Sequence, residues 1–248
     1  MNPRNLTSEE WAKVLLKSTP EIVAKNVRAR NLLPWTESLL YFTEDSKTIL
    51  DLGCGAGQNS ALLAYNGRET TLLDISKDNL NFSAGVFKIL GLKGNFQLAD
   101  MTKPLPFETN SFDTVFSIGV FEYFTDDEIR KILKEAFRVS RKRVIIMVPN
   151  ALSLAYRLGY WYLRETRQWQ WGGERPFRTL KPYFKAVKNI RFFEFTVASL
   201  HSLTFLRILP KVEIVKKLLV NASKKDSANP ALFRQGYLLV SIGEKEAR

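Results

Sequence analysis

The chain has 248 residues, 45% hydrophobic and 25% charged, which is ordinary globular composition and excludes a low-complexity or disordered protein. Its one cysteine, Cys54, excludes an intrachain disulfide, and a single cysteine with a single histidine, His201, argues against a Cys/His metal site. The lone cysteine, together with residues 1–13, which lack the apolar core of a signal peptide, favours a cytoplasmic protein.

The formal net charge of +12 is unevenly distributed. Residues 175–225 contain twelve lysines and arginines against two glutamates. A basic excess of this kind attracts acidic partners, which include an anionic substrate, a nucleic acid or a membrane surface. A solvated, soluble surface explains the same charge equally well.

The first 45 residues predict an N-terminal helical cap. Thr7 and Glu10 have the spacing of a capping box, which predicts a helix from there to about residue 18. Pro20 suits the first turn of a second helix, which should end near residue 30. A third, short helix is expected over residues 35–42.

Residues 46–150 show a regular alternation of strands and helices. We expect strands at 47–52, 69–75, 95–100, 112–118 and 143–148, and helices at 58–65, 77–90 and 125–139. Alternating elements of this kind form right-handed βαβ units around a parallel sheet. Ligands of such sheets bind outside the carboxyl ends of the strands, so the chemistry is expected there.

The pattern changes after Pro149. Residues 151–175 form an aromatic insertion, followed by a predicted helix at 179–189 and a strand at 191–198. A basic, amphipathic insertion covers 199–225, and residues 235–242 form the last strand. The last two strands have no regular helix between them and are expected to pair antiparallel at the sheet edge. The apolar run 144–163 is interpreted as a strand leading into a helix, because Pro149, Asn150 and Arg157 interrupt it.

The strongest motif follows the first predicted strand and reads Asp51-Leu52-Gly53-Cys54-Gly55-Ala56-Gly57. Glycines at this junction permit a tight turn and a close approach of the backbone to a ligand. Asp74 and Asp100 end the next two strands, where carboxylates can accept hydrogen bonds from ribose hydroxyls and from an adenine amino group. The spacing G-x-G-x-G does not match the dinucleotide fingerprint G-x-G-x-x-G.

Five segments of the chain together resemble the class I S-adenosylmethionine (SAM)-dependent methyltransferases, in particular the ubiquinone/menaquinone-biosynthesis and small-molecule branch. They are DLGCGAG, LLDIS, LADM, LPFETNSFDTVFSIGVFEYFTDDE and RVIIMVPN. The resemblance covers about residues 47–150. It implies a Rossmann-like, doubly wound α/β fold with about seven strands, of which the last is antiparallel. It also implies one methyltransferase domain over 1–248, with a helical cap (1–45), a SAM-binding core (46–150) and lid or substrate insertions with edge strands (151–248).

The resemblance further implies which residues contact SAM. Asp51, Gly53, Gly55 and Gly57 would line its methionine part, Asp74 would hold the ribose, Ile75 would pack on the adenine, Asp100 and Met101 would contact the adenine edge, and Ile118 and Gly119 would border the sulfonium and the acceptor. No metal is implied.

Candidate bases are Glu122 and Tyr123 after the fourth strand and His201 in the basic insertion, with Asn150 as an orienting group. Each has a plain structural alternative. Glu174 and Arg175 are expected to be polar contacts of a lid or surface residues. The aromatic insertion could cover the acceptor or shelter the sulfonium, or simply pack as an extra helix.

The predicted function is SAM-dependent methylation of a small molecule, anionic or aromatic, on oxygen, nitrogen or carbon. The alternatives are RNA methylation along the basic C-terminal half, a membrane-associated methylation of a lipid or quinone through residues 200–219, and a non-catalytic SAM-binding protein.

Overall fold

The computed structural model describes residues 7, 9–11, 18–169, 171–198 and 235–246. Its helices are α2 (Pro20–Arg28), α3 (Pro34–Phe42), α4 (Gln58–Tyr65), α5 (Lys77–Leu90), the 3-10 helix η1 (Phe121–Tyr123), α6 (Asp126–Val139), α7 (Leu154–Glu165) and α8 (Lys181–Phe184). Its strands are β1 (Thr48–Leu52), β2 (Glu69–Asp74), β3 (Asn95–Leu98), β4 (Phe112–Ile118), β5 (Ser140–Pro149), β6 (Ile190–Val197) and β7 (Leu238–Lys245).

The strands form one seven-stranded sheet in the order β3-β2-β1-β4-β5-β7-β6. The pairs from β3 to β5 are parallel, whereas β7 is antiparallel to both of its neighbours. The predicted fold class and the antiparallel last strand are therefore confirmed. The last two strands pair antiparallel at the sheet edge, as expected. Within this pair β7 lies next to β5, so β6 is the edge strand.

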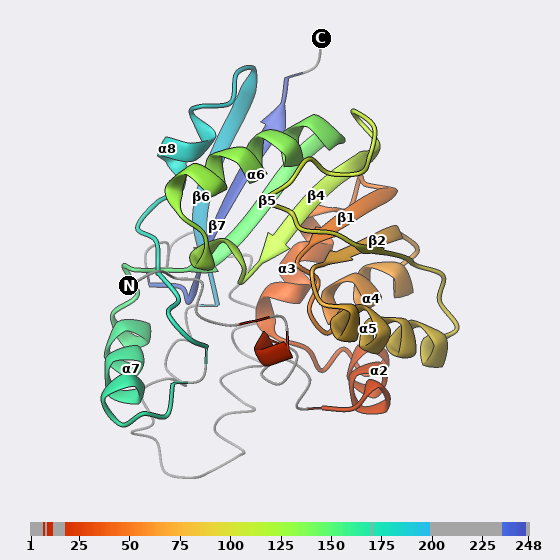
Figure 1. The fold of residues 1–248 in the computed structure, drawn as a ribbon, viewed down its shortest axis with the longest axis horizontal. Coiled ribbons are helices and arrows are strands. Elements are labelled where there is room, and N and C mark those ends of the chain that lie inside the picture. The colour runs from red at the N-terminus through yellow and green to blue at the C-terminus, as the bar shows by residue number, and fades with distance from the viewer. Residues whose placement is uncertain (1–6, 8, 12–17, 170, 199–234, 247–248) are drawn as a thin grey trace.

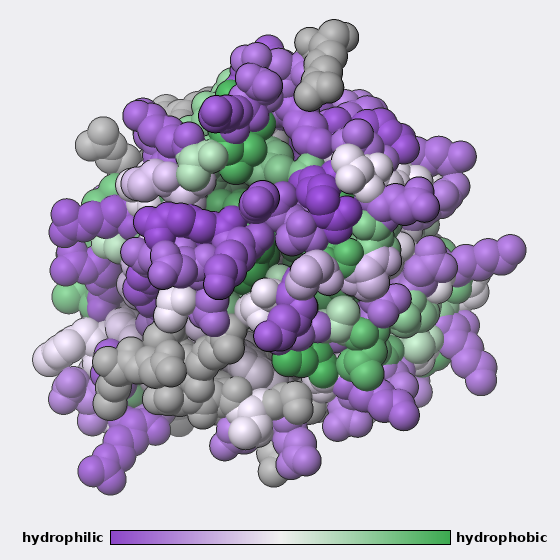
Figure 2. Space-filling view, turned by 45° about the horizontal axis from the view of Figure 1, so that its top comes forward, coloured by the Kyte–Doolittle hydropathy of each residue, from purple (hydrophilic) through white to green (hydrophobic). Residues whose placement is uncertain are grey.

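Helices cover both faces of the sheet, and alternate residues of each strand point to opposite faces. Leu50 of β1 belongs to the apolar cluster that includes Ile129 of α6, whereas Ile49 packs in the cluster of Leu39 on α3. Figure 1 shows α6 lying across β4 and β5, and α7 set apart from the sheet. In the view of Figure 2, hydrophilic side chains cover most of the surface and hydrophobic ones form small areas between them.

Local signals set several element boundaries. Glu10 and Thr7 form the expected capping box, although residues 12–17 of the first predicted helix lie outside the described residues. The hydroxyl of Ser76 accepts a bond from the Asn79 N–H at the start of α5, and Gly91 ends that helix with a left-handed φ of 68°. The helices α4 and α5 and the strand β4 have the predicted bounds.

Several predicted elements were wrong in extent. Strand β3 ends two residues earlier than predicted, and β5 begins three residues earlier. The helix expected at 179–189 is only α8, because three-residue turn bonds from Ala186 and Val187 replace helical ones and Asn189 takes a φ of 59°. The last strand starts three residues later than predicted, at Leu238. The apolar run 144–163 divides into β5 and α7 as predicted. Within the described ranges, no helix combines the length and apolar character needed to cross a bilayer.

Candidate functional site

A cavity of about 680 Å³ opens at the carboxyl ends of the parallel strands. Its lining includes the turn after β1, the ends of β2, β3 and β4, helix η1, and residues near β5 and β7. This is where an open α/β sheet binds its ligands, because helix starts and flexible loops converge there. Every predicted cofactor residue except Gly57 lines this cavity: Asp51, Gly53, Gly55, Asp74, Ile75, Asp100, Met101, Ile118 and Gly119.

The turn after β1 requires glycine. Gly53, Gly55 and Gly57 all have positive φ angles, of 79°, 52° and 69°. A Cβ atom on Gly57 would lie 2.5 Å from the Ser83 hydroxyl oxygen, and one on Gly53 would lie 2.8 Å from Val120. The Gly53 and Cys54 N–H groups both donate to the Leu73 carbonyl, which fixes the turn to β2. Gly57 therefore shapes the turn from behind the cavity and does not line it.

Asp51 ends up buried beneath this turn, with 2% of its surface exposed. Burial raises the pKa of its carboxyl to about 7, while the hydrogen bond from the Ser60 hydroxyl, 2.7 Å away, opposes the rise. The negative charge of Asp74 raises the pKa further. Asp51 is thus a cavity carboxyl that a cationic group nearby would convert to its charged form.

Asp74 holds three elements of the site together. Its carboxylate accepts bonds from the Gly55 N–H at 2.9 Å, the Ser76 N–H at 2.9 Å and the Asn79 side-chain amide at 3.2 Å. Burial raises the pKa of this carboxyl, and these hydrogen bonds counteract the effect. A carboxylate has about four acceptor positions, so three nitrogen donors leave room for a ligand hydroxyl.

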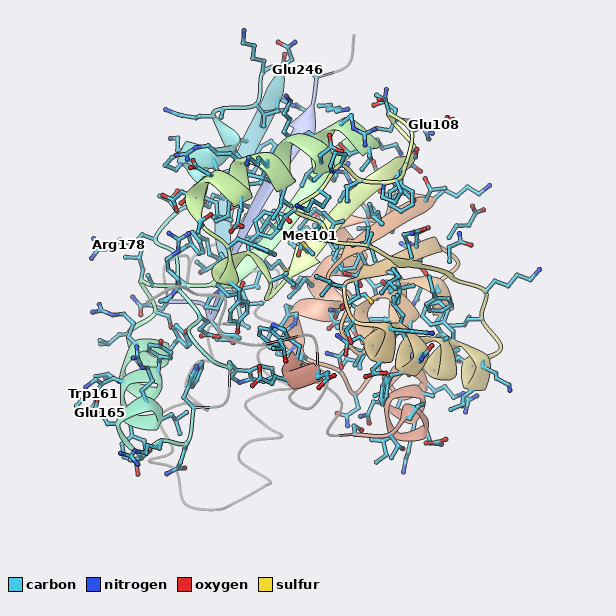
Figure 3. The ribbon with its side chains drawn as sticks, in the orientation of Figure 1. Met101, Glu108, Trp161, Glu165, Arg178 and Glu246 are labelled. Carbon is cyan, nitrogen blue, oxygen red and sulfur yellow. The ribbon has the colours of Figure 1, made fainter. Side chains whose placement is uncertain are left out.

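The other predicted cofactor residues form one wall. Ile75 is 58% exposed although it is a large apolar residue, which is consistent with a surface that a flat ligand could cover. One oxygen of Asp100 accepts bonds from the N–H and the hydroxyl of Thr102, and Met101 beside it is buried. Figure 3 places Met101 centrally, next to the end of β4.

Two glutamates lie at the opposite end of the cavity. Glu122 of η1 is 2% exposed and Glu174 is 6% exposed, and both line the cavity. Burial, followed by the charge of Glu174, raises the pKa of Glu122 well above its usual value. Burial raises the pKa of Glu174 to about 7, against hydrogen bonds from Tyr156 and Tyr123. Tyr123, another predicted base, donates its hydroxyl hydrogen to Glu174 at 3.5 Å. Its ring lies against that of Trp11, with ring centroids 4.6 Å apart.

Of the two alternatives for Glu174, a surface residue was wrong, because its side chain is buried and bonded to Tyr156 and Tyr123, whereas a polar contact of a lid stays a prediction. The Arg175 N–H donates to the Glu122 carbonyl at 3.2 Å, and this bond attaches the segment of Glu174 to η1. The sequence carried one weak signal for Glu174, an acidic residue in an aromatic stretch that also contains Glu165. Trp11, Trp171 and Tyr237 also line the cavity, and sequence reasoning did not assign Tyr237 to it.

Of the remaining candidates, Asn150 does not line the cavity. Asn150 is buried, and its amide donates to the Gly236 carbonyl and accepts from the Leu152 N–H, so it fixes the backbone near β7. His201 lies outside the described residues. Of the aromatic insertion, Tyr156 is fully buried, whereas Trp161 points away from the sheet in Figure 3 and is 63% exposed.

Residues 49–143 match a family model described as a methyltransferase domain. The match covers less than half of the chain, so it shows a similarity of these residues to such a domain. Together with the sheet order, the match confirms the resemblance to the class I methyltransferases.

Curated proteins also match parts of the chain. The chain is 34% identical over 92 residues to phosphoethanolamine N-methyltransferase 1 of Triticum aestivum, covering 35% of this chain and 18% of that protein. It is 25% identical over 117 residues to magnesium-protoporphyrin O-methyltransferase of Rhodobacter capsulatus, covering 46% and 50%. The matches thus span at most half the length of these curated relatives.

Solved structures share the fold over most of the chain. The magnesium protoporphyrin IX methyltransferase of Synechocystis, crystallised with S-adenosylhomocysteine (SAH), superposes with a TM-score of 0.60 at 13% identity, covering 96% of this chain and 94% of that one. A SAM-dependent methyltransferase from Archaeoglobus fulgidus gives 0.59 at 19% identity, covering 92% and 96%. At these identities the likeness shows the fold alone.

Proposed function

We propose that this protein binds SAM in the cavity and transfers its methyl group to a small-molecule acceptor. The observation that carries this proposal is the set of buried carboxyls and glycine turns that meet at the carboxyl ends of β1 and β2. The match to a methyltransferase domain and the SAH-bound and SAM-bound structural neighbours support the choice of ligand.

The described residues fit this cofactor. The turn 53–57 brings backbone against the cavity where a side chain would block it, Asp74 retains an acceptor position for a ribose hydroxyl, and Ile75 offers an exposed apolar surface to the adenine. When bound, SAM supplies a methyl group already activated on a positively charged sulfur. Asp51, Asp74 and Asp100 line the cavity, which makes it favourable for a cationic ligand.

The chain's main contribution to such a reaction is alignment. Holding donor and acceptor in line contributes about 7–11 kcal/mol to lowering a barrier of this type. Glu122 and Tyr123 lie just beyond Gly119, so we propose that they face the acceptor, and a base at that position typically adds about 10²–10⁴-fold in rate. We propose that residues 151–198 and 235–246 enclose the acceptor end, since Trp171, Glu174 and Tyr237 come from them.

The lining supports an aromatic acceptor. Trp11, Tyr123, Phe124, Trp171 and Tyr237 supply rings at this end, whereas no lysine, arginine or histidine of the described residues lines the cavity. Nothing in the described lining thus favours an anionic acceptor. The RNA alternative depends on the basic C-terminal half, of which residues 199–225 lie outside the described residues. The membrane alternative depends on residues 200–219, all of which lie outside them.

Calorimetric titration with SAM tests the proposal. We expect saturable binding, and we expect Asp74→Ala to weaken it about 10–100-fold, since hydrogen bonds to a charged group contribute about 1.5–3 kcal/mol each. Asp74→Asn, which keeps the side-chain size, should weaken it in the same direction. Glu108→Gln, an exposed change far from Met101 in Figure 3, is the matched control and should leave the affinity unchanged. Absence of SAM binding by the native chain would rule the proposal out.

A further inference from the structure

The two glutamates at the acceptor end form a pair that the fold does not neutralise. Glu122 has one buried carboxyl oxygen, Oε2, without a hydrogen-bond partner in the described part of the chain. A buried polar atom left in this state costs about 1–3 kcal/mol, so a persistent one calls for a partner that arrives from outside. Because Glu122 lines the cavity and lies 98% buried beside Gly119, a cavity ligand is the available partner.

The groups around the pair are neutral hydroxyls, not cations. Tyr156 and Tyr123 donate to the two oxygens of Glu174. Burial, followed by the charges of Glu174 and Glu122, raises the pKa of the Tyr237 hydroxyl well above its usual value, so this group is neutral as well. Arg175, next in the chain, is directed elsewhere: it pairs with Asp126 at 2.7 Å and covers the ring of Phe177. The described residues therefore place no cation against the pair, and a ligand that carries positive charge or hydrogen-bond donors would stabilise it.

The rest of the cavity has the same character. Five acidic residues line it, and the described lining contributes no basic side chain. The rings of Trp11, Tyr123, Trp171 and Tyr237 line the same cavity as Glu122, and the faces of such rings attract cations. Although the whole chain carries a formal charge of +12, its cavity is acidic and aromatic, the combination that selects an organic ammonium group.

We propose that the acceptor is an amine, which Glu122 and Glu174 bind as its ammonium ion and which Glu122 deprotonates for methylation. This rests on the proposed function. One N–H proton passes to the carboxylate, which leaves a lone pair on nitrogen. That lone pair forms the new N–CH₃ bond, and the S–CH₃ bond breaks with its electrons remaining on sulfur. The product is a methylated ammonium ion and a neutral thioether, so charge and atoms balance.

The acid–base properties of the pair suit this step. Burial raises the pKa of Glu174 to about 7, and burial together with the charge of Glu174 raises the pKa of Glu122 well above its usual value. Two carboxyls coupled in this way take up a proton near neutral pH, and an ammonium ion placed between them favours their charged form. Glu122 can thus hold the ammonium ion and then accept its proton.

Binding of three probes of equal size tests the proposal without any turnover. Benzylamine, benzyl alcohol and benzoate are titrated by calorimetry into the native protein saturated with SAH. We expect benzylamine to bind at least about tenfold more tightly than benzoate, with benzyl alcohol between them. Glu122→Gln and Glu174→Gln should each remove at least about tenfold of the benzylamine affinity, while Glu108→Gln leaves it unchanged.

SAH affinity, measured in the same samples, separates the two proposals. If SAH does not bind the native protein, the proposed function fails. If SAH binds normally but the native protein shows no preference for benzylamine over benzoate, the amine proposal alone is overturned. A preference that persists undiminished in both glutamine variants, with SAH affinity intact, overturns it equally, because other groups would then be responsible.

Discussion

The two ends of the cavity bury the same chemical group in different ways. At the glycine end, Asp51 and Asp74 are held by donors of the fold: the Ser60 hydroxyl for one, and two backbone N–H groups and an amide for the other. At the acceptor end, Glu174 receives only tyrosine hydroxyls and Glu122 Oε2 receives nothing from the described residues. Buried carboxyls that the fold satisfies keep their positions without a ligand, whereas an unsatisfied carboxyl oxygen leaves a hydrogen bond for a ligand to supply.

The largest effect should come from the glycine end, through Gly57→Ala. The new Cβ would meet the Ser83 side chain at 2.5–2.7 Å in addition to the cost of a φ of 69°. We expect a loss of about 3–4 kcal/mol in the free energy of unfolding, measured in urea. Gly91→Ala is the matched control, because its φ of 68° is the same and nothing lies within 4 Å; it should lose only about 1–2 kcal/mol. Equal losses would mean that the close approach to Ser83 is unimportant.

The acceptor end should make the free energy of unfolding depend on pH. The pKa of Glu174 is raised to about 7 from 4.5, so the folded protein holds a proton that the unfolded chain releases. Its contribution to stability is full below pH 4.5 and is lost as the pH rises to about 7, an effect on the order of 3 kcal/mol. Urea unfolding at several pH values should show this slope, and Glu174→Gln should flatten it. An unchanged slope in Glu174→Gln would assign it to Asp51 or Glu122 instead.

Glu122→Met should stabilise the protein. Replacing a buried carboxyl that lacks a partner with an apolar side chain of similar length removes a desolvation cost of about 1–3 kcal/mol. Thermal unfolding at pH 7 would record the gain, and SAH affinity should be retained. A clear loss of stability would show that Glu122 serves the fold, which would erase the difference between the two ends.

The smallest effect is expected for Ser60→Ala. Losing the 2.7 Å bond to the buried Asp51 should cost about 1–2 kcal/mol and move the pKa of Asp51 further upward, because burial then acts unopposed. Ser111→Ala is a matched control, since that hydroxyl bonds an exposed loop carbonyl. If both variants lose the same stability, the glycine end holds its carboxyl less firmly than the geometry indicates.

Much of the fold and one end of the site followed from local patterns. The bounds of α4, α5 and β4 could be predicted because glycines and a capping serine mark their ends. The carboxyl ends of parallel strands meet at one edge, so Asp51, Asp74 and Asp100 could be assigned to one cavity from their positions in the sequence. In contrast, the helix expected at 179–189 was predicted to start too early and to be too long. The hydroxyl of Thr179 and the N–H of Leu180 donate to Glu194 of β6, and no local sequence pattern predicts this contact.

The sequence by itself determined the βαβ core and its glycine turn, since these depend on periodicity, capping and backbone freedom within short stretches. Only the tertiary structure decided that β7 separates β5 from β6 and that Glu174 is buried beside Glu122. The physical reason is that pairing between distant segments depends on which backbone groups and apolar surfaces remain unsatisfied once the core has formed. The bond from the Arg175 N–H to the Glu122 carbonyl is such a pairing, and it brings Glu174 next to Glu122 at the acceptor end of the cavity.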